Sequence, residues 1–171
     1  MRKIIIASFI LFSFLGCEEV TEPEQNFEVF AINNRDYFPY VNMRIENATS
    51  SIYIIMCYML YDEENPNYAV NLLLDKLVEA HQEKGVEIKV LLDDEDANVD
   101  AKNYLQNRGI EVRFDSDDVR THSKLLIIDG RSLIIGSTNW TESALNKNNE
   151  TSVEIMDENI ANTYLTYFNE L

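Results

Sequence analysis

The chain has 171 residues and carries 30 acidic against 14 basic side chains, for a formal charge of −16. Hydrophobic residues make up 46% of it, enough to fill the core of one domain, which excludes wholesale disorder. Two cysteines and five glycines exclude a disulfide scaffold and a collagen-like repeat, and the acidity argues against nucleic-acid binding through bulk positive charge.

The N-terminal residues have the pattern of an export signal. Two basic residues precede an apolar run over 4–15 that ends at Gly16-Cys17. A helix of that length spans about 18 Å, short of the roughly 30 Å core of a bilayer. The residues around Cys17 resemble a bacterial lipobox, which implies lipid attachment there. We expect a signal peptide at 1–16, a lipidated tether at 17–26, and an exported lipoprotein anchored on the periplasmic or cell-surface side of a membrane. An ordinary signal peptide or a membrane anchor is the alternative.

Strand-like and helix-like segments alternate from residue 27 onward. Apolar, β-branched runs predict strands at 27–32, 51–57, 86–92 and 110–114. Helices are predicted at 40–48, from an Asn65-Pro66 cap to Gly85, and at 99–107. Cys57, inside an apolar run, is expected to be a buried small hydrophobe. The alternation predicts one α/β domain over 27–171, with a largely parallel sheet flanked by helices.

A β-hairpin is predicted between 121 and 135. Asp129-Gly130 separates two apolar runs and is a strong signal for a two-residue turn. If these two residues form the turn, Ile128 lies opposite Arg131. A slip of one residue would move every side chain to the other face, so this register is a specific prediction.

The open end of the hairpin gathers polar side chains. In the predicted register His122 lies opposite Ser137, Lys124 shares the face of His122, and Asn139 follows just beyond. Ammonium, amide and hydroxyl groups can hold the non-bridging oxygens of a phosphodiester, and a neutral histidine can attack its phosphorus. Taken singly, each residue also has a structural interpretation. His122 could be a structural strand residue, Lys124 a solvated surface lysine, and the segment 136–139 an ordinary turn.

Together these residues form a known pattern. His122-x-Lys124-x4-Asp129, followed by Gly136-Ser137-x-Asn139, resembles the HKD signature of the phospholipase D superfamily. Glu150 stands where members of this family carry an acidic residue that supports the histidine. The order of strands and helices over 27–171 is similar to that of the short, single-motif members.

The resemblance implies a metal-independent phosphodiesterase without a cofactor, acting through a covalent phosphohistidine. His122 would attack phosphorus, and Glu150 would orient it and fix its tautomer. The phosphoryl oxygens would be held by Lys124, Ser137 and Asn139. Asp129 belongs to the motif, but the hairpin explains it as a turn residue that supports the motif.

One motif provides only half of such a site, because in-line displacement places the nucleophile and the leaving group on opposite sides of phosphorus. The only other histidine, His81, continues an apolar helical line and is interpreted as a packed or helix-surface residue. We therefore expect the second motif histidine to come from another copy, in a two-fold homodimer with the site at its interface.

The substrate is left open between nucleic acid, slightly favoured, and phospholipid, which a membrane anchor would favour. Basic residues near the motif, and two farther away, would have to form a positive groove on the acidic surface: Arg120, Lys124, Arg131, Arg44 and Arg113. The run at 93–96 suggests a metal-dependent nuclease as an alternative, but a solvated loop is preferred, as it is for the acidic residues at 115–118. A catalytically idle binding lipoprotein is the remaining hypothesis.

Overall fold

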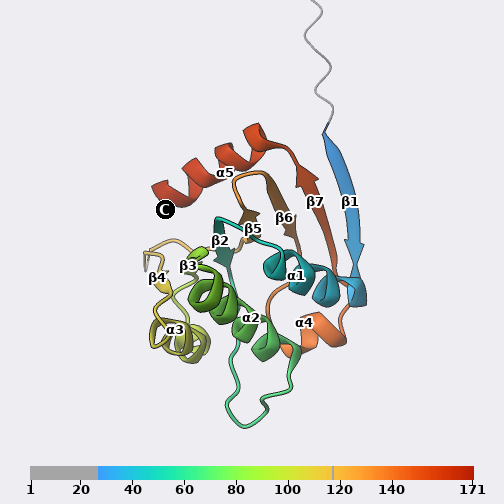
Figure 1. Cartoon of the computed structure of the whole chain (residues 1–171). Coiled ribbons are helices and arrows are strands. Elements are labelled where there is room, and N and C mark those ends of the chain that lie inside the picture. Colours follow the sequence, from blue (N-terminus) through green and yellow to red (C-terminus); the bar gives the residue numbers. More distant parts are fainter. Residues whose placement is uncertain (1–26, 117) are drawn as a thin grey trace, which may run out of the picture.

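The computed structural model describes residues 27–116 and 118–171 (Figure 1). The expected signal peptide at 1–16, the tether at 17–26 and the lipid-attachment residue Cys17 lie outside them. Within this part of the chain, no helix has the length and apolar character needed to cross a bilayer.

A seven-stranded sheet with the order β1-β7-β6-β5-β2-β3-β4 forms the centre of the domain. Its strands are β1 (Glu28–Asn33), β2 (Ser51–Met56), β3 (Glu87–Leu92), β4 (Glu111–Phe114), β5 (Lys124–Ile128), β6 (Ser132–Gly136) and β7 (Thr151–Met156). The predicted α/β sheet flanked by helices is confirmed. It is less parallel than expected, because only the β2–β3 and β3–β4 pairs are parallel. Strands β5, β6 and β7 run up and down in sequence, and β1 adds antiparallel at the edge.

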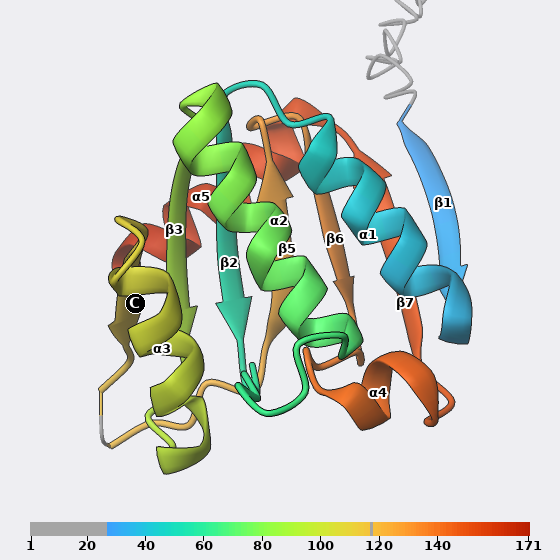
Figure 2. The same cartoon turned by 60° about the horizontal axis from the view of Figure 1, so that its bottom comes forward.

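Helices cover both faces of the sheet (Figure 2). They are α1 (Tyr37–Glu46), α2 (Ala69–Lys84), α3 (Val99–Gln106), α4 (Glu142–Asn146) and α5 (Glu158–Glu170). Helices α1, α2 and α3 lie over the face with the larger core, and α5 crosses the opposite face. Along β5 the side chains alternate, so that Leu126 and Ile128 join the larger core and Leu125 and Ile127 join the core under α5.

Two helix starts differ from the predicted ones. The first helix begins at Tyr37 rather than at residue 40, which places Pro39 in its first turn, where a missing N–H costs nothing. The second begins at Ala69 because the predicted cap residue Asn65 lies in a turn, and Glu142 from α4 accepts the Ala69 N–H at 3.0 Å. Gly85 ends this helix as predicted, with φ 72°.

The predicted hairpin forms, but its register is shifted by one residue. The ladder aligns Ile128 with Ser132, not with Arg131. Asp129 and Gly130 both have positive φ, and the Arg131 N–H donates to the Ile128 carbonyl at 3.0 Å. The two-residue turn therefore closes as expected, and Arg131 is left as an extra residue outside the ladder.

A buried polar network joins α1 to the sheet. Arg44 Nε lies 2.9 Å from the carboxylate of Glu154, which is 1% exposed, and its guanidinium donates to Ser132 Oγ at 3.0 Å. Tyr40 donates its hydroxyl to the same carboxylate. Burial, together with this carboxylate, raises the pKa of Tyr40 to about 12. Arg44 thus stabilises the fold and does not contribute to a surface groove.

Candidate active site

Most of the predicted site residues gather at one end of the sheet. The Ser123 carbonyl, next to His122, accepts the Cys57 N–H at 3.0 Å just beyond β2. Asn139 Oδ1 accepts the Tyr58 N–H at 3.3 Å. The segments that precede β5, follow β2 and follow β6 therefore lie side by side, as the loops at the lower end of the sheet in Figure 2 also show.

His122 and Lys124 differ in exposure. The His122 imidazole is exposed, and no hydrogen bond reaches it from residues 27–116 or 118–171. Lys124 is only 6% exposed, and its ammonium donates to the His122 carbonyl at 2.8 Å. An accessible imidazole thus stands next to a cation that is largely removed from water, where its charge acts at lower dielectric.

Ser137 and Glu150 form a second contact group. Ser137 donates its hydroxyl to the Glu150 carboxylate and accepts the Thr151 N–H at 3.1 Å. Asn148 Nδ2 donates to the other carboxylate oxygen at 3.0 Å. Within the described part of one chain, Glu150 therefore holds Ser137, and its expected support of His122 stays a prediction.

The shifted register changes which residue lies level with His122. Continuing the ladder beyond the Leu125–Ile135 pair places Lys124 level with Gly136 and His122 level with Thr138. Thr138 is buried and contacts Ser152 Oγ at 3.2 Å. Ser137 is therefore one position away from the predicted pairing, although it lies at the same end of the sheet.

Asp129 is at the other end of β5. The extended chain between it and His122 spans about 20 Å, so its carboxylate does not belong to the cluster around His122. The carboxylate instead accepts the N–H groups of Thr49, Ser50 and Ser51 at 2.8–3.1 Å. Burial alone would raise the pKa of Asp129, but these hydrogen bonds outweigh it and lower the pKa. The structure assigns Asp129 a supporting role at the turn, not a place among the reacting groups.

The expected positive groove is not assembled within the described chain. Of the five expected basic residues, Lys124 and Arg120 lie near His122, but Lys124 is largely buried and the Arg120 guanidinium pairs with Asp93 and Glu95 at 3.4 and 3.7 Å. Arg131, beside the hairpin turn, pairs with Glu158, and Arg113 donates to a carbonyl of α5 at 2.9 Å.

The acidic run at 93–96 is not simply a solvated loop. Asp93 is 3% exposed, accepts the Thr121 N–H at 2.7 Å and pairs with Arg120. The following residue, Asp94, is exposed. Across residues 27–116 and 118–171, no three histidine, cysteine, aspartate or glutamate side chains come together as a metal site.

His81 and Cys57 have structural roles, as predicted. His81 Nδ1 lies 3.0 Å from the Val86 carbonyl, where it helps to close the C-terminal turn of α2. Cys57 is fully buried as a free thiol.

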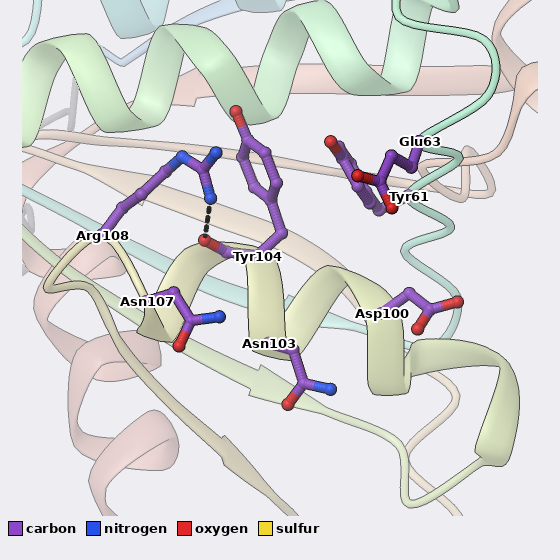
Figure 3. Close-up of a pocket in the computed structure, with 7 residues that line it drawn as sticks. All are labelled: Tyr61, Glu63, Asp100, Asn103, Tyr104, Asn107 and Arg108. Atoms are coloured by element: carbon purple, nitrogen blue, oxygen red, sulfur yellow. Dashed lines mark hydrogen bonds between the residues drawn. The ribbon is translucent and has the colours of Figure 1, made fainter.

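A cavity of about 300 Å³ lies away from the motif, between α3 and the loop after β2 (Figure 3). Its wall includes Tyr61 and Tyr104, which stack with ring centroids 4.2 Å apart, and Arg108, whose guanidinium lies 3.6 Å from the Tyr104 ring centroid. None of the residues that line it belongs to the predicted site.

Comparison with known proteins decides the family. Residues 41–171 match the model of the cardiolipin synthase, PLD-like domain. The chain belongs to the phospholipase D superfamily. It is 33% identical over 130 residues to a phospholipase D of Rickettsia bellii, covering 74% of this chain and 59% of the relative. It is 33% identical over 99 residues to a mitochondrial cardiolipin hydrolase of Chlamydomonas reinhardtii, covering 57% and 44%. The chain thus spans about half the length of these relatives.

Among solved structures, the phospholipase D family member Nuc of Salmonella typhimurium is similar, with a TM-score of 0.73 and 26% identity. The alignment covers 85% of this chain and 93% of Nuc. Sequence reasoning missed two features of this phospholipase D-like site: the tie from Asp93 to the segment that carries His122, and the tight approach of Gly136 to β7. The glycine of Gly136-Ser137 was a visible signal for the second, whereas the first depends on a contact distant in sequence.

Proposed function

We propose that this phospholipase D-like chain is a metal-independent phosphodiesterase that uses His122 as its nucleophile. The observation that carries this proposal is the exposed His122 ring beside the buried Lys124 ammonium, with Asn139 at the same end of the sheet. An exposed imidazole can reach a phosphodiester, and a cation and an amide beside it can stabilise the charge that develops on the phosphoryl oxygens.

The reaction would proceed in two displacements. In the first, a ring nitrogen of His122 bonds to phosphorus while the bond from phosphorus to the leaving oxygen breaks, and a second histidine donates a proton to that oxygen. In the second, the same histidine takes a proton from water, whose oxygen attacks phosphorus and releases His122. Ser137 and Asn139 would help Lys124 to hold the phosphoryl oxygens, and Glu150 would orient His122 in the assembled site.

The second histidine would come from another copy of the chain. His81 is engaged with the Val86 carbonyl in α2, and the sequence contains no third histidine. A two-fold homodimer that brings the two His122 rings to its axis would supply both the nucleophile and the acid.

The place where the domain begins, at the start of β1, supports a nucleic-acid substrate. It argues against a phospholipid of the membrane to which the chain would be anchored. Glu28, at the start of β1, pairs with Met156, which pairs with Ser132 beside the hairpin turn (Figure 2). His122 lies at the opposite end of the sheet. Ten residues, 17–26, can reach at most about 35 Å. With a lipid on Cys17 and an exported chain, a straight tether would leave the site facing away from the bilayer.

Phospholipid hydrolysis is the second candidate, because the relatives are named phospholipase D and cardiolipin hydrolase. One experiment separates the two substrates and tests the mechanism. Residues 17–171 with Cys17→Ser would be incubated in EDTA with plasmid DNA and, separately, with cardiolipin-containing vesicles. We expect EDTA-resistant cleavage of DNA that is lost in His122→Ala and retained in the control His81→Gln. Lipid cleavage alone would reverse the substrate choice, and loss of activity in EDTA would contradict the metal-free mechanism.

A further inference from the structure

The segment 120–123, which carries His122 into the site, lies outside any helix or strand. Two backbone ties flank the histidine: the Thr121 N–H donates to Asp93 Oδ1 at 2.7 Å, and the Ser123 carbonyl accepts from the Cys57 N–H at 3.0 Å. The second tie continues the β2–β5 ladder, whereas the first depends on one side chain. The direction of the His122 backbone therefore depends on Asp93.

Asp93 is itself held firmly. Its own N–H donates to the Met56 carbonyl at 3.3 Å, and its carbonyl accepts from Asn98 Nδ2 at 2.8 Å. Asn98 is fully buried and also accepts the Met59 N–H at 2.8 Å. The backbone of Asp93 is thus anchored to β2 and to the N-cap residue of α3. The second oxygen of its carboxylate lies 3.4 Å from Arg120 Nε and 3.9 Å from the Cys57 thiol.

A buried carboxylate needs such partners, since an unpaired charge away from water costs several kcal/mol. Two of its three partners, Arg120 and Thr121, are the residues that precede His122, so the contacts that neutralise the buried charge also fix the loop. We propose that Asp93 is a positioning residue for catalysis, which sets the direction of the His122 ring through the Thr121 N–H and touches no reacting atom itself. The proposal rests on the proposed role of His122 as nucleophile.

Two substitutions separate the geometry of the acceptor from its charge. Asp93→Asn keeps an acceptor oxygen at the same reach but removes the charge, and we expect kcat within about 3-fold of the wild type. Asp93→Glu keeps the charge but lengthens the side chain by one methylene, and we expect kcat to fall about 10- to 100-fold because displacements near 1 Å carry penalties of that order. KM should change less than about 3-fold in both, because Asp93 does not contact substrate.

A matched control is available on the neighbouring strand. Asp115 follows β4 as Asp93 follows β3, and its carboxylate accepts the Asp94 N–H at 2.9 Å but makes no hydrogen bond or ion pair with 120–123. Asp115→Glu should therefore leave kcat within about 2-fold of the wild type. An equal loss in Asp115→Glu, a loss in Asp93→Asn as large as in Asp93→Glu, or unchanged kcat in Asp93→Glu would each overturn the proposal.

A measurement without substrate distinguishes this proposal from the proposed function. Amide hydrogen exchange at Thr121 should be protected in the wild type and in Asp93→Asn, and at least about 10-fold faster in Asp93→Glu. Equal protection in all three proteins would overturn the positioning role. Absence of activity toward every phosphodiester, with the expected exchange pattern, would instead overturn the role of His122 while leaving the tie from Asp93 to Thr121 established.

Discussion

Gly136 is the position at which a single methyl group should disturb the site most. A Cβ placed there would lie 2.2 Å from Ser152 Oγ, 2.3 Å from the Thr151 carbonyl oxygen and 2.5 Å from Ser152 Cα. The Thr151 carbonyl oxygen and Ser152 Cα are backbone atoms of β7, so a change of side-chain rotamer cannot relieve their clash with the added Cβ. To restore an ordinary contact of 3.4 Å with the carbonyl, strands β6 and β7 must separate locally by about 1 Å.

Gly136→Ala should therefore lower both stability and activity. Overpacking of this kind costs about 1–3 kcal/mol, and the Ser137–Thr151 hydrogen bonds, at 2.9 and 3.1 Å, would add about 1 kcal/mol each if they break. We expect the melting temperature to fall by about 10 °C. Because the shift moves Ser137 and the chain leading to Asn139 by about 1 Å, kcat per folded molecule should fall about 100-fold.

Gly85→Ala is the matched control for Gly136→Ala. Nothing lies within 4 Å of a Cβ at Gly85, but its φ of 72° makes alanine strained there by about 1–2 kcal/mol. This variant should lose stability at the end of α2 and keep the wild-type kcat. Thermal unfolding and hydrolysis of a small chromogenic phosphodiester, measured on both variants below their melting temperatures, provide the comparison. A Gly136→Ala protein with a wild-type melting temperature and kcat would refute the tight β6–β7 approach on which the reasoning depends.

Two further predictions concern the turn and the assembly. Because the folded-state pKa of Asp129 is lowered, its carboxylate stabilises the fold at neutral pH, and this contribution is lost progressively as the pH falls from about 4 through the lowered pKa. Asp129→Asn should therefore cost about 1–3 kcal/mol of unfolding free energy at pH 7 and less at pH 3, as urea titrations would measure; a gap independent of pH would contradict this assignment. If the site needs two copies of His122, specific activity should fall on dilution in parallel with the dimer fraction from sedimentation velocity, and a monomer with full activity would exclude the dimeric site.

The sequence predicted local features well and distant contacts poorly. The strands at 51–56 and 87–92 follow from runs of β-branched and aliphatic residues, and the end of α2 follows from Gly85, because these signals act within a few residues. The predicted hairpin register was wrong because it depends on a contact distant in sequence. The carboxylate of Asp129 is bound by the backbone at 49–51, about eighty residues away, and Arg131 is left out of the ladder. No local pattern reports such an anchor.

The acidic run at 93–96 is a second case in which contacts distant in sequence decided the structure. Four consecutive acidic residues resemble a solvated loop, and Asp94 is indeed exposed. The carboxylate of Asp93 is buried with partners that lie far from it along the chain: Cys57, Arg120 and the Thr121 N–H. His122, Lys124 and Ser137, by contrast, could be found because their spacing along one hairpin brings them to one end of the sheet, whereas Asp129 of the same motif lies at the turn.

The charge of −16 has a different meaning once the cations are located. Arg44 is paired with Glu154 under α1, Arg131 lies near the turn, and Arg120 is paired with Asp93 and Glu95. Lys124, next to His122, has no carboxylate partner among the described residues, and it is largely buried. A site built this way would bind a phosphodiester through short-range contacts from one ammonium, an amide and a hydroxyl, and would gain little from long-range attraction. Because few phosphate charges would be neutralised per chain, binding of a nucleic acid should depend only weakly on salt, unlike binding by a basic groove.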